Sequence, residues 1–150
     1  MGFKSELRGF ILHFKVPAQY TLGDLLVNLE AALAPIREPE RLGMLVDASL
    51  AENFRSLDEI LGLLPALAQW QQRLVGIAVV VGNDTHFGIT NQLAVYGEDL
   101  GLDIKPFQHA RAAEAWLKQQ LRAAHAVAAS GNTLNMTGIS LETGEPDQQL

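Results

Sequence analysis

The chain has 150 residues, a net charge of −6 and no cysteine; 48% of its residues are hydrophobic and 19% are charged. These values are typical of one globular domain, and they exclude disulfides, thiol catalysis and thiolate zinc sites. An acidic chain binds a phosphate backbone poorly, so we expect no nucleic-acid partner. No stretch is apolar enough to cross a bilayer and the start has no apolar leader, so we expect a cytoplasmic protein without an integral membrane segment.

The first part of the chain predicts strands that alternate with helices. Residues 9–16 are rich in aromatic and branched side chains and predict a strand, and Thr21 is an N-cap for a helix over residues 22–34. The nearly continuous apolar run 42–47 is typical of a strand buried on both faces. The segment that precedes residue 9 is available as an antiparallel edge of the same sheet.

The next predicted helix, over residues 57–72, contains its own breaking signals. Ser56 and Glu59 form an S-x-x-E capping box that marks the start of this helix. Gly62 and Pro65 lie near its middle, and proline removes a backbone donor and crowds the preceding turn. We therefore predict a kink or a break in the helix.

The rest of the chain repeats the alternation. The apolar run 74–81 predicts the central strand of the sheet, and residues 85–97 follow it as a helix. Residues 103–107 predict an edge strand because they contain Pro106, and residues 110–124 predict the last helix. Alternating strands and helices imply parallel pairing, so we predict an α/β domain with a mostly parallel sheet of four or five strands, flanked by about four helices.

The composition divides the chain into a domain and a tail. The predicted domain covers residues 1–127, and residues 128–150 are polar, rich in glycine and threonine, and without lysine or arginine. We predict that this tail is flexible. Within the tail, apolar and polar residues alternate weakly over residues 134–141, a pattern compatible with a strand added to a sheet edge.

The helix over residues 57–72 is apolar around most of its circumference, so it has to cover more than one surface. Three interpretations stay open from the sequence. The helix forms a subunit interface, it forms a wall of a lipophilic pocket, or the break at Pro65 turns its second half into a core-lining segment. The candidate interface residues are Leu57, Leu61, Leu64 and Trp70.

Polar residues follow the two most apolar strands. In open α/β sheets ligands gather at the carboxyl ends of the strands, which makes Asp47, Ser49, Asn83, Asp84 and His86 candidate ligand-binding residues. A hydrolase would use Ser49 as nucleophile with Asp47 and His86. The simpler interpretation is that these side chains cap turns and helices. The chain has no metal-ligand spacing, no phosphate loop and no dinucleotide fingerprint, so we expect no metal and no cofactor.

Five segments of the chain resemble the STAS superfamily, in particular its SpoIIAA-like group, which is related to anti-sigma-factor antagonists and to the Sec14-like lipid-binding fold. The segments are LVDAS at 45–49, RSLDEI at 55–60, GIAVVVGND at 76–84, HFGITNQLA at 86–94 and KPFQHARAAEAWL at 105–117. The resemblance implies a STAS-like α/β fold and a non-catalytic protein-interaction or regulatory module that acts as a dimer. A carrier or sensor of a small hydrophobic ligand is the alternative, followed by a small hydrolase.

The resemblance also points to one modification site. In the antagonist branch, a phosphorylated serine begins the helix after the second core strand, and the matching position here is near Ser56. The helix N-terminus would favour a phosphate there, whereas Asp58 and Glu59 would repel it. This chain also lacks the acidic residue and the glycine that flank the serine in the antagonist pattern. A plain capping box is therefore the interpretation that we favour for Ser56.

Overall fold

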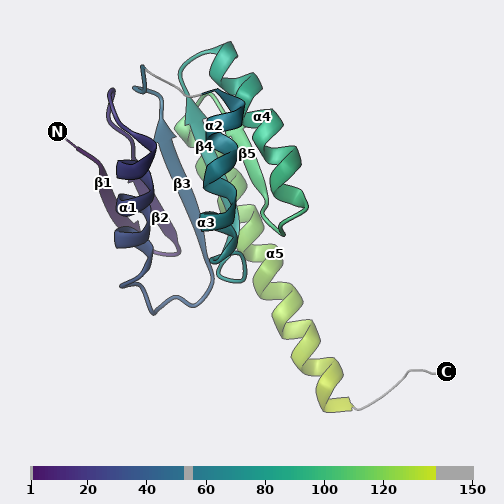
Figure 1. Cartoon of the computed structure of the whole chain (residues 1–150). Helices are drawn as coiled ribbons and strands as arrows, with labels where there is room; N and C mark the ends of the chain where they lie inside the picture. Colours follow the sequence, from purple (N-terminus) through teal and green to yellow (C-terminus); the bar gives the residue numbers. More distant parts are fainter. Residues whose placement is uncertain (1, 53–55, 138–150) are drawn as a thin grey trace.

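The computed structural model describes residues 2–52 and 56–137, and the sheet lies at its centre (Figure 1). Five strands in the order β1-β2-β3-β4-β5 form this sheet. The strands are β1 (Lys4–Arg8), β2 (Ile11–Lys15), β3 (Leu42–Ala48), β4 (Leu74–Val81) and β5 (Ile104–Phe107). β1 pairs antiparallel with β2 and every other pair is parallel, which confirms the predicted mostly parallel α/β sheet.

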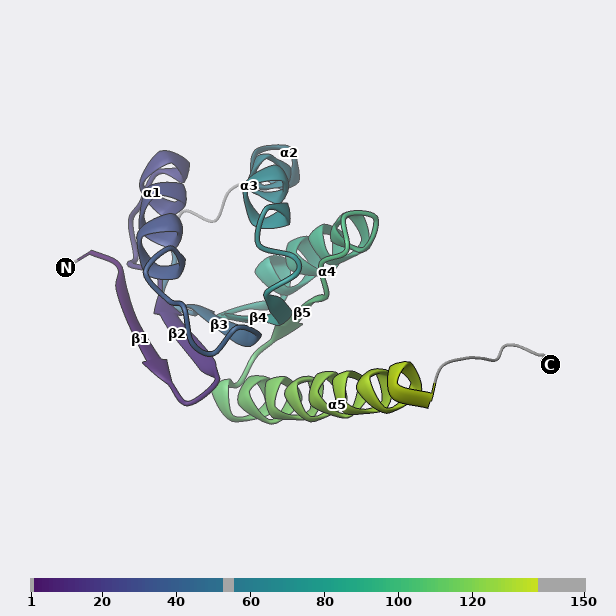
Figure 2. The same cartoon turned by 90° about the horizontal axis from the view of Figure 1, so that it is seen from below.

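The helices cover the two faces of the sheet unequally. On one face lie α1 (Leu22–Leu33), the broken helix that follows β3, and α4 (Asp84–Glu98), whereas α5 (Ala110–Thr137) lies alone on the other face (Figure 2). The sheet therefore separates two apolar cores, a larger one beneath the first set of helices and a smaller one beneath α5.

The helix after β3 is broken where the sequence predicts it. Its three parts are α2 (Leu57–Ile60), the single 3-10 turn η1 (Leu61–Leu63) and α3 (Leu64–Ala68). Pro65 occupies the first turn of α3, where its missing N–H costs no hydrogen bond. Regular helix ends at Ala68, four residues earlier than expected, because the chain turns there toward β4.

The segment before β2 forms the antiparallel edge strand β1. A two-residue loop of Gly9 and Phe10 joins the two strands, and Gly9 has a φ of +62°, a conformation that glycine adopts without steric cost. The Cα partners across the hairpin include Lys4 with Lys15 and Glu6 with His13.

Helix α5 packs closely on the sheet because two glycines lie beneath it. A Cβ atom at Gly43 would come within 3.0 Å of Leu117 Cδ2, and one at Gly76 within 3.0 Å of Trp116 Cη2. α5 continues to Thr137, beyond the expected end at residue 124, so its last turns fall in the segment predicted as tail. Residues 138–150 of that predicted tail lie outside the described residues.

Candidate functional site

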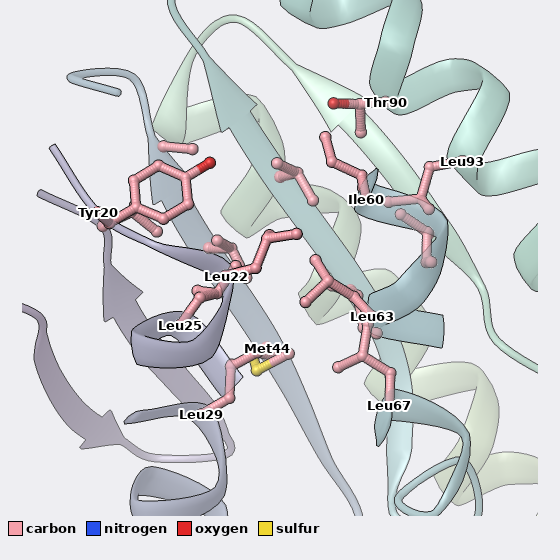
Figure 3. Close-up of a pocket in the computed structure, with 16 residues that line it drawn as sticks. Tyr20, Leu22, Leu25, Leu29, Met44, Ile60, Leu63, Leu67, Thr90 and Leu93 are labelled. Carbon is pink, nitrogen blue, oxygen red and sulfur yellow. The ribbon is translucent and has the colours of Figure 1, made fainter. Parts of the chain in front are cut away.

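An apolar cavity lies between the sheet and the helices of the larger core. Side chains of α1 and of the α2–α3 segment point toward one another across it, and β3 and β4 form its floor (Figure 3). Its volume is about 80 Å³, and 14 of its 16 lining residues are apolar, among them Leu25, Leu29, Met44, Leu63 and Leu67. A wall of a lipophilic pocket is one of the three interpretations of residues 57–72, and the α2–α3 segment lines this cavity.

Two hydroxyl groups complete the lining. Tyr20 and Thr90 come from the β2–α1 connection and from α4. Thr90 is 1% exposed, and its Oγ1 donates a hydrogen bond of 2.9 Å to the His86 carbonyl oxygen. Because that donor is already engaged within α4, the Thr90 hydroxyl does not require a polar ligand. The lining therefore suits an apolar molecule.

A surface groove adjoins the cavity. It lies between α1 and α3, has a volume of about 220 Å³, and is lined mainly by Leu26, Leu29, Leu33, Ala66, Leu67 and Trp70. Leu29 and Leu67 line both the groove and the cavity. The groove and the cavity therefore meet at the same two side chains, one from α1 and one from α3.

The residues at the carboxyl end of β3 make local turn contacts. The Asp47 carboxylate accepts hydrogen bonds from the backbone N–H of Ser49 at 3.1 Å and from its hydroxyl at 2.6 Å. This geometry is that of an Asx turn, in which a side-chain oxygen satisfies backbone donors just after a strand. It agrees with the simpler of the two interpretations of Asp47 and Ser49.

The candidates after β4 make contacts at the start of α4, where one of them is the cap. Asn83 is the N-cap of α4 and accepts a 2.9 Å hydrogen bond from the His86 backbone N–H, and Asp84 accepts a 2.8 Å bond from Gln108 Nε2. Burial lowers the pKa of the His86 imidazole below its usual value. A role in ligand binding or catalysis stays a prediction for all five of these residues.

The candidate interface residues pack mainly toward the core. Leu64 is buried, and Leu61 and Trp70 are partly buried against the larger core; Leu57 is also partly buried. This arrangement is the one expected for a core-lining segment after the Pro65 break. An interface role for these residues stays a prediction.

Ser56 is the N-cap of α2, as the capping box predicts. Its hydroxyl accepts from the Glu59 backbone N–H at 3.5 Å, and its side chain is exposed. Phosphorylation of Ser56 stays a prediction, and residues 53–55, which precede it, lie outside the described residues.

A polar basin on the α5 side of the sheet is a feature that the sequence analysis missed. It has a volume of about 700 Å³ and is lined by β1, β2, the end of β3 and the first turns of α5. Its charged side chains are Lys4, Glu6, Arg8, Lys15, Asp47 and Glu114. The sequence pattern that could have predicted this basin is the charged residue at every second position of Lys4–Arg8, which is typical of a strand with one polar face.

His13 lies in the floor of this basin. Its Nε2 atom is buried, and no described residue forms a hydrogen bond with it. Burial lowers the pKa of the His13 imidazole below 6.5, with a smaller contribution from repulsion by Arg8; Glu114 and Glu6 act in the opposite direction. The folded protein therefore favours the neutral imidazole.

This shift predicts that acid destabilises the fold partly through His13. The unfolded state takes up a proton as the pH falls below about 6.5, whereas folded His13 resists it, so stability decreases through that range. We expect His13→Gln to reduce the decrease in unfolding free energy between about pH 7.5 and about pH 5.5. Urea titrations at both pH values measure it. A His13→Gln variant that loses as much unfolding free energy between the two pH values as the unaltered chain would contradict the prediction. The pKa of His86 is also lowered by burial, so His86 contributes part of the decrease that the variant retains.

The described residues contain no candidate metal cluster and no candidate membrane-spanning helix. In the part of the chain that the structure describes, no cluster of three or more histidine, aspartate or glutamate side chains has the arrangement of a metal site. Within the same residues, no helix has the length and apolar character needed to span a bilayer.

Comparison with known proteins identifies the fold. No protein-family model and no curated protein matches the sequence. One solved structure that is similar is an uncharacterised protein of the DUF3478 family with a SpoIIAA-like fold, from Shewanella loihica PV-4. The two chains are 24% identical with a TM-score of 0.54, over 77% of this chain and 92% of that one. The strand order, the helix placement and this likeness together assign a SpoIIAA-like α/β fold to the chain.

Proposed function

We propose that this protein carries or senses a small apolar ligand, which binds between the sheet, α1 and the α2–α3 segment. The observation that supports this most directly is the apolar cavity, which meets a surface groove at Leu29 and Leu67. Ligand sites in proteins are usually apolar concavities with few polar groups, and this lining has two hydroxyls among 16 residues.

The size of the cavity limits the class of ligand. A dry cavity of about 150 Å³ admits benzene in another protein, and the cavity here is about 80 Å³. A slim hydrocarbon chain therefore fits better than a ring system, with one end in the cavity and the rest along the groove. Binding would require Leu29 and Leu67 to move apart. The short helical pieces on either side of η1 make the α2–α3 segment the element best suited to shift.

The test uses a defined fatty acid. Native mass spectra of the purified chain with added dodecanoic acid, together with a fluorescence titration with cis-parinaric acid, measure binding to the apolar site. Ala48→Leu places extra carbons in the cavity, because Ala48 is a buried lining residue. We expect this variant to bind at least about tenfold more weakly, since each buried methylene contributes on the order of 0.8 kcal/mol.

Ala112→Leu is the matched control, because Ala112 is an exposed residue of α5 and contributes nothing to the cavity. It should bind both probes as the unaltered chain does. Absence of binding by the unaltered chain, or equal affinities of the two variants, would contradict the proposal.

The protein-interaction role implied by the resemblance stays a second prediction. Its candidate residues on the broken helix pack mainly toward the core, so this segment supports the ligand role better than an interface role. The cytoplasmic location expected from the sequence is also part of this prediction.

A further inference from the structure

The outer edge of β1 has no partner within the described chain. β1 is the first strand in the sheet order, it pairs only with β2, and all five of its residues are exposed. Figure 2 shows β1 at the margin of the sheet, beside α1 and well away from α4. An edge strand presents unpaired N–H and C=O groups, which are a template for pairing with another strand.

The register of the hairpin determines which backbone groups point outward. In a hairpin with a two-residue loop, the pair that closes the loop is hydrogen-bonded, and here that pair is Arg8 with Ile11. Hydrogen-bonded and non-hydrogen-bonded pairs alternate along the strands, so Glu6 and Lys4 also bond inward to β2. The N–H and C=O groups of Ser5 and Leu7 therefore point outward, toward solvent.

The side chains of β1 are complementary to a second copy of the same strand. We propose that two copies of this chain associate through antiparallel pairing of β1 with β1, with Ser5 opposite Ser5 of the partner. The two-fold axis then passes between the two Ser5 residues, perpendicular to the sheet. Lys4 of each copy lies opposite Glu6 of the other, and the two sheets join into one.

The basin face of β1 selects this register. The Lys4–Glu6 pair occurs twice by symmetry, and it falls at non-hydrogen-bonded positions, where opposite side chains come closest. The next allowed register, with Glu6 opposite Glu6, would also place Lys4 opposite Arg8 and would therefore create repulsive pairs only. A further shift, with Leu7 opposite Leu7, places Glu6 opposite Arg8 but sets Ser5 and Lys4 against Gly9 and Phe10, which form the loop beyond the end of β1.

The other face of β1 favours the same register. Phe3 packs on Phe14 with ring centroids 5.6 Å apart, and Leu7 remains 37% exposed. With Ser5 at the centre, Leu7 of each copy lies opposite Phe3 of the other. The pairing would therefore cover an exposed leucine with a partly buried aromatic ring that packs against the core.

Charged residues on edge strands normally prevent pairing, and Lys4, Glu6 and Arg8 would do so against most strands. Here the same charges admit one self-pairing register and penalise its neighbour. The strand is short, so the interface is small and we expect a weak dimer whose population depends on protein concentration.

The test is sedimentation equilibrium of the full chain from about 10 µM to about 1 mM, the range in which small interfaces dissociate. Ser5→Pro removes an outward N–H at the centre of the pairing and leaves the inward bonds of β1 intact, as proline is tolerated on the free side of an edge strand. Ser5→Ala keeps the N–H and is its control. We expect Ser5→Pro to remain monomeric at concentrations where the unaltered chain and Ser5→Ala are dimeric.

Charge reversal tests the register. Lys4→Glu places like charges opposite each other twice and should weaken the dimer about tenfold or more, whereas the double variant Lys4→Glu, Glu6→Lys restores opposite charges and should restore the dimer. Circular dichroism spectra verify that each variant folds. A chain that stays monomeric throughout the concentration range, a dimer unaffected by Ser5→Pro, or a double variant as weak as Lys4→Glu would each overturn the proposal. None of these results depends on whether the apolar cavity binds a ligand.

Discussion

Leu117→Ala is expected to lower the free energy of unfolding by about 3–5 kcal/mol, near the upper end for a leucine truncation. Leu117 is 0% exposed and lies on the sheet where Gly43 and Gly76 provide no side chains. The cost of such a truncation depends on how far neighbours collapse into the space. Gly43 and Gly76 are register partners in the β3–β4 pairing, which holds their backbone in place, so the cavity persists.

Urea unfolding followed by circular dichroism measures this effect, with the slope of the transition as a check that the unfolded state is unchanged. Leu100→Ala is the matched truncation, because Leu100 is 41% exposed and should cost less than about 1 kcal/mol. A loss below about 1 kcal/mol for Leu117→Ala would show that α5 does not depend on this contact.

Gly82→Ala should destabilise the fold by about 2–3 kcal/mol, because the new methyl group has no room. A Cβ atom at Gly82 would lie 2.6 Å from the backbone carbonyl oxygen of Ser49. Neither atom belongs to a flexible side chain, so either the end of β4 or the turn after β3 has to shift. That turn holds the Asp47 carboxylate against Ser49, and the variant should disturb it as well.

Gly88→Ala is the opposite case within the adjoining helix. No heavy atom lies within 4 Å of a Cβ at Gly88, and the residue is in the interior of α4. Alanine there should stabilise the protein by about 0.5–1 kcal/mol through helix propensity alone. Thermal unfolding of the two variants measures both effects, a loss of stability for Gly82→Ala and a gain for Gly88→Ala. A Gly82→Ala variant as stable as Gly88→Ala would contradict the predicted steric clash.

The elements that sequence analysis predicts well are those with an unambiguous local signal. β3 and β4 are continuous apolar runs between turn residues, and such runs suit strands buried on both faces. The break after η1 follows from the chemistry of Pro65. β1 is harder to predict, since an exposed edge strand with charged side chains has little apolar periodicity.

The candidate site is less predictable because it depends on distances between elements. The apolar circumference of residues 57–72 agrees equally with an interface, a pocket wall and a core segment, and only the position of α1 opposite it creates the cavity. The same limit applies to His13. The residues next to His13 in the sequence do not predict that Glu114 lies in the same basin, because Glu114 belongs to a helix 101 positions later in the chain.

The two glycines beneath α5, Gly43 and Gly76, constrain how the sequence of this protein can evolve. A side chain at Gly43 or Gly76 would press on Leu117 or Trp116, so a larger residue at either position is best accommodated together with a smaller one on α5. The cavity side has unfilled volume and accepts single substitutions of similar size. Single substitutions can therefore accumulate around the cavity while the packing of α5 on the sheet stays constant.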